Sequence, residues 1–122
     1  MRTVGQHWER CAEAYLSRQG LQSIARNFAT RHGEIDLIML DEHHIAFVEV
    51  RYRSASRFGD ARLSVTATKQ RRVRRCAQSF LQTHPAWQSY PCRFDVIAYD
   101  AHRDVHEPLW LRAAFDTTTG MS

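Results

Sequence analysis

The stretch that decides the fold is residues 33–53, GEIDLIMLDEHHIAFVEVRYR. Two apolar runs, residues 33–40 and 45–53, flank a polar turn, Asp41-Glu42-His43-His44. Apolar runs of this length on either side of a short polar turn predict a β-hairpin. A turn of these four residues places Leu40 opposite Ile45, and the register of the whole hairpin follows from that pair.

The predicted register brings two acidic residues together, because Asp36 then lies opposite Glu49 and Glu34 lies opposite Arg51. Residues opposite one another on antiparallel strands share a face, with Cβ atoms about 4.5–5.5 Å apart. Two carboxylates at that distance among apolar neighbours are costly unless a cation lies between them. Oxygen ligands of this kind favour Mg²⁺ or Mn²⁺. The alternative is that each acid pairs with Arg51, Arg53 or a helix arginine, without a metal.

The rest of the chain predicts one α/β domain over residues 1–122. Periodicity and end signals predict a helix at 6–19, a strand at 21–29, a helix at roughly 67–83 capped by Thr66 or Thr68, a strand at 91–99, and a strand or short helix at 108–115. With the hairpin strands, the order is α-β-β-β-α-β plus a short final element, which favours a mixed sheet flanked by helices. Residues 116–122 read as a frayed tail.

Composition gives weaker indications about environment and partners. The chain has 122 residues, 43% hydrophobic and 25% charged, with a formal net charge of +4. This positive balance is a mild indication of a polyanionic partner. Three cysteines without a CxxC motif predict free thiols in a reducing cytoplasm. The first ten residues contain no apolar segment typical of a secretory signal, and no apolar run is long enough to span a bilayer.

The second predicted helix is strongly basic near its start, where residues 69–75 read KQRRVRR. The start of a helix also carries the positive pole of the helix dipole, where phosphates bind readily. Salt-sensitive contact with DNA, or with RNA as a second candidate, is therefore expected. The alternative is an ordinary solvated basic face. The residues expected to contact nucleic acid are Arg53, Arg57, Lys69, Gln70, Arg71, Arg72 and Arg75.

Four stretches, taken in order, resemble the PD-(D/E)xK nuclease superfamily and its restriction-endonuclease-like fold. They are Gly33-Glu34-Ile35-Asp36-Leu37-Ile38, Phe47-Val48-Glu49-Val50-Arg51, Lys69-Gln70-Arg71-Arg72 and Arg93-Phe94-Asp95-Val96-Ile97. Within that superfamily the chain resembles the uncharacterised YraN family, whose members are similar to archaeal Holliday-junction resolvases. The resemblance extends over about residues 5–99.

This resemblance implies a metal-dependent nuclease that hydrolyses DNA phosphodiesters, with branched or single-stranded DNA as candidate substrates and a homodimer as the expected assembly. It implies Mg²⁺ or Mn²⁺ bound by Asp36 and Glu49, with the backbone carbonyl of Val50 and a further carboxylate, Glu9, from the first helix. Arg51 would complete the catalytic set of Glu9, Asp36, Glu49 and Arg51. Glu34 and Gly33 would support the site.

One position departs from the superfamily pattern, because Arg51 stands where active members usually have lysine. Arginine keeps its charge at any ordinary pH, so it cannot act as a base. It can still stabilise developing negative charge or clamp a phosphate. Two alternatives to the nuclease therefore stay open: a catalytically weak or inactive nucleic-acid-binding module of the same fold, and a protein-interaction domain with an internal salt network.

Overall fold

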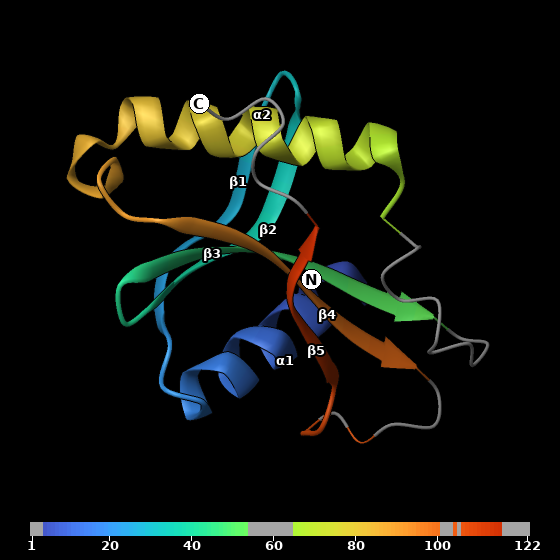
Figure 1. The fold of residues 1–122 in the computed structure, drawn as a ribbon. Coiled ribbons are helices and arrows are strands. Elements are labelled where there is room, and N and C mark those ends of the chain that lie inside the picture. Colours follow the sequence, from blue (N-terminus) through green and yellow to red (C-terminus); the bar gives the residue numbers. More distant parts are fainter. Residues whose placement is uncertain (1–3, 54–64, 101–103, 105, 116–122) are drawn as a thin grey trace.

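The structure, a computed structural model, describes residues 4–53, 65–100, 104 and 106–115. Its elements are α1 (Val4–Arg18), β1 (Gln22–Thr30), β2 (Gly33–Asp41), β3 (His44–Arg53), α2 (Ala67–Thr83), the short 3₁₀ helix η2 (Pro85–Trp87), β4 (Cys92–Asp100) and β5 (Leu109–Phe115) (Figure 1). This confirms the predicted order and makes the last segment a strand. The predicted tail, 116–122, lies outside the described residues.

The five strands form one mixed sheet in the order β1-β2-β3-β4-β5. Neighbouring strands are antiparallel except β3 and β4, which run parallel and are joined through α2. A parallel pair needs such a crossover, whereas antiparallel neighbours need only a turn. In Figure 1, α2 lies above the sheet and α1 below it. The predicted mixed α/β architecture is therefore confirmed.

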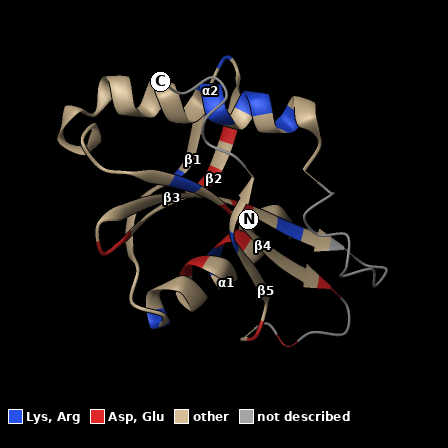
Figure 2. Ribbon diagram, in the orientation of Figure 1, with Lys and Arg blue, Asp and Glu red and all other residues tan. Residues whose placement is uncertain are grey.

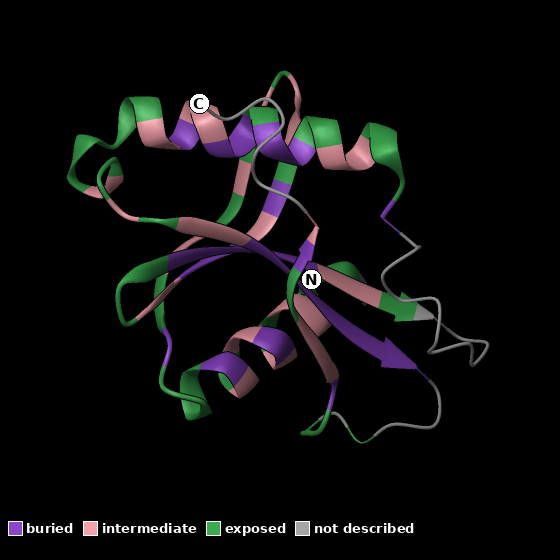
Figure 3. Ribbon diagram, in the orientation of Figure 1, coloured by how far each residue is buried: buried purple, intermediate pink, exposed green. Residues whose placement is uncertain are grey.

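Each helix covers its own hydrophobic core. The core under α1 contains Ala12, Leu16, Leu21, Leu37, Met39, Ala46, Val48, Ile97 and Tyr99. The core under α2 contains Ile35, Ile38, Ile45, Phe47, Val73, Cys76, Ala77, Phe80 and Phe94. β3 alternates between the two cores, as a strand covered on both faces must. Figure 3 shows buried residues running through the middle of the sheet and exposed ones on the outer side of α2.

The three cysteines are free thiols, as predicted. Cys76 is fully buried in the α2 core, and the hydroxyl of Thr30 lies 3.1 Å from its sulfur. None of the described helices is long and apolar enough to cross a membrane.

The hairpin of β2 and β3 has the predicted register, but its pairing stops early. Leu40 faces Ile45, and the ladder continues as far as Leu37 and Val48. Within the described residues no β2–β3 backbone pair lies beyond that point, so the expected pairing of Glu34 with Arg51 is not seen. Asp36 and Glu49 do meet as predicted, through their side chains. Asp36 Oδ2 also accepts a hydrogen bond of 2.8 Å from the backbone N–H of Val50. A side chain thus joins the two strands where their backbones part.

β2 is also bent at this position. Ile35 and Leu37 are two residues apart and should share a face, yet Ile35 packs in the α2 core and Leu37 in the α1 core. Across the β1–β2 pair, Asn27 lies between the partners of these two residues and has a φ of 52°. Asparagine tolerates this left-handed conformation better than most residues. The bend interrupts the regular alternation of side chains along β2, and the side chain of Asp36 lies on the α1 side, beside Glu9.

At the other side of the sheet, β5 is fastened to β4 by a fully buried carboxylate. Asp95 is 0% exposed and accepts hydrogen bonds from Arg93 Nε at 3.1 Å, Trp110 Nε1 at 3.1 Å and the backbone N–H of Ala113 at 3.0 Å. The β4–β5 register shifts here, and Ala113 has a φ of 50°. Arg93 also binds Asp41 at 2.8 Å. The stretch around Asp95 therefore has a structural role.

Candidate functional site

Four carboxylates from three elements converge where β2 and β3 part. Glu9 of α1, together with Glu34 and Asp36 of β2, each place a carboxylate oxygen within 4.8 Å of the other two. Glu49 of β3 joins them through a hydrogen bond with Asp36. All four were candidates from the sequence. Glu34, predicted only to support the site, lies close enough to Glu9 and Asp36 to be a ligand itself. These four residues are called the acid cluster below.

Two oxygens of the acid cluster are buried without a hydrogen-bond partner. Glu49 is only 5% exposed. Within the part of the chain that the structure describes, neither Glu9 Oε1 nor Glu49 Oε2 takes part in a hydrogen bond. A buried polar atom without a partner costs about 1–3 kcal/mol, and more when it is charged. Hard divalent cations bind carboxylate oxygens of this kind, so the donor set fits Mg²⁺ or Mn²⁺.

Burial, together with crowding of the carboxylates, raises two of their pKa values. The pKa of Glu9 rises from 4.5 to about 7, chiefly because the carboxyl is buried. The charge of Asp36 and a hydrogen bond with Asp36 are the next largest causes, and the charge of Glu34 adds to the rise. A hydrogen bond with Asn27 opposes it. Burial also raises the pKa of Glu49 to about 8, again with help from Asp36. Both acids therefore hold protons near neutral pH that a cation would displace.

Lys69 lies at the acid cluster, not only at the nucleic-acid surface where the sequence placed it. Its Nζ is 3.5 Å from Glu49 Oε2, and its charge opposes the rise in the pKa of Glu49. It is the only lysine in the sequence. The hydroxyl of Thr66 accepts a hydrogen bond of 3.2 Å from the backbone N–H of Lys69, which caps α2 and fixes its first turn.

The other predicted nucleic-acid contacts are distributed unevenly. Arg71, Arg72 and Arg75 are exposed on α2, and Figure 2 shows the basic residues concentrated in the first half of that helix. Gln70 is occupied at the start of the helix, where its amide donates to the carbonyl of Val65 at 2.9 Å. Among the catalytic candidates, Arg51 is half-buried on β3 and its charge acts on Glu49. The side chain of Arg53 and the whole of Arg57 lie outside the described residues.

A pocket of about 420 Å³ reaches Glu9 from the α1 side, and sequence reasoning did not identify it as a site. Its lining also includes Arg10, Arg26 and Asn27. Asn27 is the residue whose left-handed backbone accompanies the bend in β2, and its amide bonds to Glu9. The polar pair Arg26-Asn27 interrupts an otherwise mostly apolar strand, which is the signal that could have identified these residues.

The raised pKa values predict how stability varies with pH in metal-free protein. A carboxyl whose pKa is higher in the folded state binds more protons folded than unfolded between its two pKa values. The stability that these two protonated acids contribute is therefore fully present below pH 4.5 and is lost as the pH rises through about 7 for Glu9 and about 8 for Glu49. We expect the thermal unfolding midpoint in a chelator to fall by several degrees between pH 5.5 and pH 8.5.

The control for this titration is Glu49→Gln, which resembles the protonated acid at every pH. Its unfolding midpoint should decline less steeply over the same range. Mn²⁺ should raise the midpoint of wild type more at pH 8.5 than at pH 5.5, because fewer protons must be displaced. An equal slope in wild type and Glu49→Gln would contradict the assignment of the titration to the acid cluster.

Comparison with known families and proteins places the chain in a family. Residues 8–99 match the family model described as Uncharacterised protein family UPF0102, a range that includes the whole acid cluster and Lys69. A UPF0102 protein of Halorhodospira halophila is 51% identical over 114 residues, 93% of this chain and 88% of that protein. One from Pseudomonas putida is 47% identical over 114 residues, 93% of each chain. The match confirms the predicted YraN-like family, and the chain belongs to UPF0102.

Proposed function

We propose that this protein is a metal-dependent nuclease with a restriction-endonuclease-like fold, acting on the phosphodiester bonds of DNA. The observation that carries the proposal is the convergence of Glu9, Asp36 and Glu49 at one place. Among the described residues, Glu9 Oε1 is buried without a hydrogen bond, and the buried Glu49 Oε2 has only the ammonium group of Lys69 beside it, at 3.5 Å. A cluster that raises its own pKa values and lowers stability is typical of a functional site. The order α1-β1-β2-β3-α2-β4 supports the fold assignment through the resemblance stated above.

In this proposal Asp36, Glu49 and Glu9 hold Mg²⁺ or Mn²⁺, with the carbonyl of Val50 as a further ligand. A bound divalent cation lowers the pKa of water and neutralises charge on a phosphate. Asp36 has a second task, because its bond to the N–H of Val50 holds the parted strands together at the site. Glu34, exposed at the edge of the acid cluster, contributes negative charge that favours the cation.

Two cationic side chains lie where they can stabilise a phosphate at the acid cluster. Arg51 occupies the superfamily's usual lysine position and can stabilise negative charge that develops in the transition state. Lys69 reaches the same carboxylate, Glu49, from α2. We propose that Lys69 supplies from the helix the ammonium group that β3 lacks. Arg71, Arg72 and Arg75 would then hold the DNA backbone without reading its sequence.

The test is cleavage of single-stranded and four-way-junction DNA in Mn²⁺. Wild type is expected to cut at least one of these substrates, and Asp36→Asn to cut neither. Lys69→Gln should lower the single-turnover rate constant by about 100-fold or more, the usual effect of removing one group that stabilises transition-state charge. Arg112→Gln is the matched control, because it removes one positive charge from an exposed residue of β5, where the guanidinium lies 4.0 Å from the ring centre of Trp110.

The second candidate function, a binding module with little or no cleavage, is favoured by one observation, the arginine at position 51. The variant Arg51→Lys distinguishes the two. Cleavage by wild type that depends on Lys69 supports the nuclease. Cleavage that appears only in Arg51→Lys supports the binding module, and equal rates for Lys69→Gln and Arg112→Gln remove Lys69 from the mechanism. The homodimer expected from the resemblance stays a prediction.

A further inference from the structure

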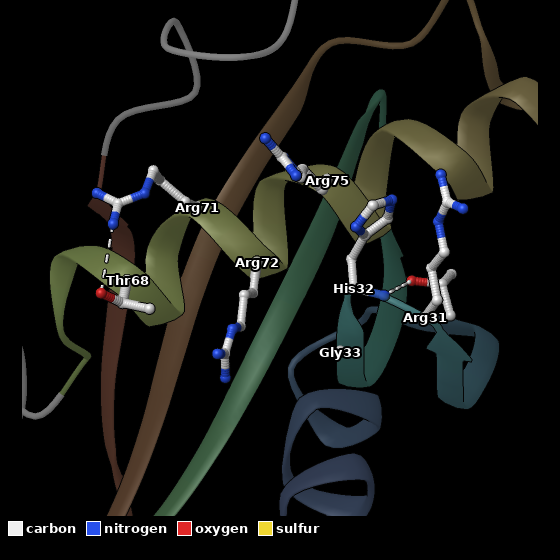
Figure 4. A pocket seen from close by; sticks show the side chains of 8 residues that line it. Arg31, His32, Gly33, Thr68, Arg71, Arg72 and Arg75 are labelled. Carbon is white, nitrogen blue, oxygen red and sulfur yellow. Dashed lines mark hydrogen bonds between the residues drawn. The ribbon is translucent and has the colours of Figure 1, made fainter.

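A basic pocket of about 610 Å³ lies between the β1–β2 turn and α2, next to the acid cluster but separate from it. Arg71, Arg72 and Arg75 line it from α2, and Arg31 and His32 line it from the turn (Figure 4). The three helix residues were expected from the sequence to contact nucleic acid, whereas Arg31 and His32 of the turn carried no expectation.

The turn is built to hold its two residues in place. Thr30 and Gly33 pair across the hairpin, and the hydroxyl of Thr30 accepts a hydrogen bond of 3.0 Å from the backbone N–H of His32. Gly33 has a φ of 144°, a conformation that side chains other than hydrogen rarely allow. A Cβ at Gly33 would lie 3.6 Å from Cβ of Arg72, so the backbone of the turn passes close to the helix.

No acidic residue of the described chain lines the pocket to balance its positive charge. Its lining contains four arginines. Within the described residues, no carboxylate forms an ion pair with any of these arginines, and Arg71 instead donates a hydrogen bond of 3.3 Å to Thr68 on its own helix. Four cations gathered in one hollow repel one another in the absence of an anion. The arrangement therefore fits an anionic ligand.

We infer that this pocket binds the phosphodiester backbone of a nucleic-acid strand, a few nucleotides away from the phosphate at the acid cluster. The inference rests on the proposed function for the identity of the strand. Guanidinium groups bind phosphate oxygens in bidentate fashion, and the lining contains no Phe, Tyr or Trp on which a base could stack. The four guanidinium groups make phosphate the main group that the pocket would bind.

The location of the pocket favours a nucleic-acid strand as the ligand, and not a free polyphosphate, because a strand can continue from the pocket to the acid cluster. Gly33 and Asp36 are three residues apart on β2, which is about 10 Å along a strand. Lys69 and Arg72 are one helical turn apart on α2, about 5 Å. A single strand can cover a separation of about 10 Å within a few nucleotides. Both edges of the pocket, β2 and α2, lead directly to residues of the candidate site.

The test compares the salt dependence of binding to a fluorescently labelled single-stranded DNA, measured in a chelator so that no cleavage occurs. The double variant Arg31→Gln/Arg72→Gln removes one cation from each side of the pocket. It should reduce the slope of log K against log salt concentration by about 1.4, since each lost phosphate contact on a single strand is worth about 0.7. The control Arg18→Gln/Arg112→Gln removes the same charge from α1 and β5 and should leave the slope nearly unchanged.

Two further arms separate the possible failures. In the first arm, inorganic tripolyphosphate is titrated into wild type and the double variant by calorimetry. If tripolyphosphate binding depends on Arg31 and Arg72 but DNA binding does not, the pocket binds a free polyphosphate and the nucleic-acid assignment is overturned. Mn²⁺ is titrated into both proteins as well. If wild type takes up no Mn²⁺ but the DNA slope still depends on Arg31 and Arg72, the metal-dependent function fails and the pocket stands. Equal DNA slopes in the double variant and the control would refute the pocket.

Discussion

Asp36→Asn is expected to abolish divalent-metal binding and, at pH 8, to stabilise the metal-free protein. Asparagine has the same shape and keeps an oxygen that can accept the N–H of Val50, so the connection between β2 and β3 persists. What it removes is the negative charge that raises the pKa of both Glu9 and Glu49. The loss of function and the gain in stability therefore have the same cause.

The expected loss of Mn²⁺ affinity is at least about 100-fold, because even residues that only support metal ligands cost 10- to 100-fold when replaced. Titration calorimetry with Mn²⁺ measures the affinity, and thermal unfolding in a chelator at pH 8 measures the stability. Asp104→Asn is the matched control, since Asp104 is an exposed aspartate whose carboxylate also accepts a backbone N–H, from His106 at 2.8 Å. Wild-type affinity in Asp36→Asn would remove the metal site.

Asp95→Ala is expected to cost about 3–5 kcal/mol of unfolding free energy, the largest effect on stability anticipated for this protein. The substitution leaves Arg93 without its buried carboxylate partner and removes the acceptor for Trp110 Nε1 and the N–H of Ala113. Ala113 lies where the register shifts, so the loss affects the part of β5 that its backbone pairing holds least well. Urea denaturation measures the difference.

The comparison variant is Asp41→Ala, which removes the other carboxylate that binds Arg93. Asp41 is 21% exposed at its side chain, and Arg93 keeps Asp95, so we expect a cost of about 1 kcal/mol or less. Equal costs for the two alanine variants would show that the ion pair with Arg93, and not the fastening of β5, determines the role of Asp95. Neither variant should change Mn²⁺ affinity, because neither touches the acid cluster.

The hairpin could be predicted from the sequence because its information is local. A four-residue turn between two apolar runs leaves one register that buries both runs, and Leu40 faces Ile45 as expected. The second helix could also be predicted, since Val73, Cys76 and Phe80 recur at helical spacing and Thr66 can cap the start. The four acids of the cluster were identified by the same register together with the family resemblance.

The features that the sequence did not reveal depend on contacts between distant segments. The bend at Asp36 depends on Asn27 in the neighbouring strand, and a period-two pattern assumes that no such bend exists. The distance of 3.5 Å between Lys69 Nζ and Glu49 Oε2 depends on how α2 packs against the sheet, which residue spacing alone does not give. The pocket at the hairpin turn needs Arg31 and α2 side by side, which is a tertiary property.

The parting of β2 and β3 beyond Leu37 and Val48 bears on which ions the centre can accept. A continuous ladder would fix the gap between two facing carboxylates at one value. Here Asp36 and Glu49 lie where the two backbones have separated, connected by the hydrogen bond from the N–H of Val50 to Asp36 and by the side-chain hydrogen bond between Asp36 and Glu49. Within the described residues no β2–β3 backbone pair sets the distance between these two carboxylates, so cations of different radius can be bound without breaking such a pair.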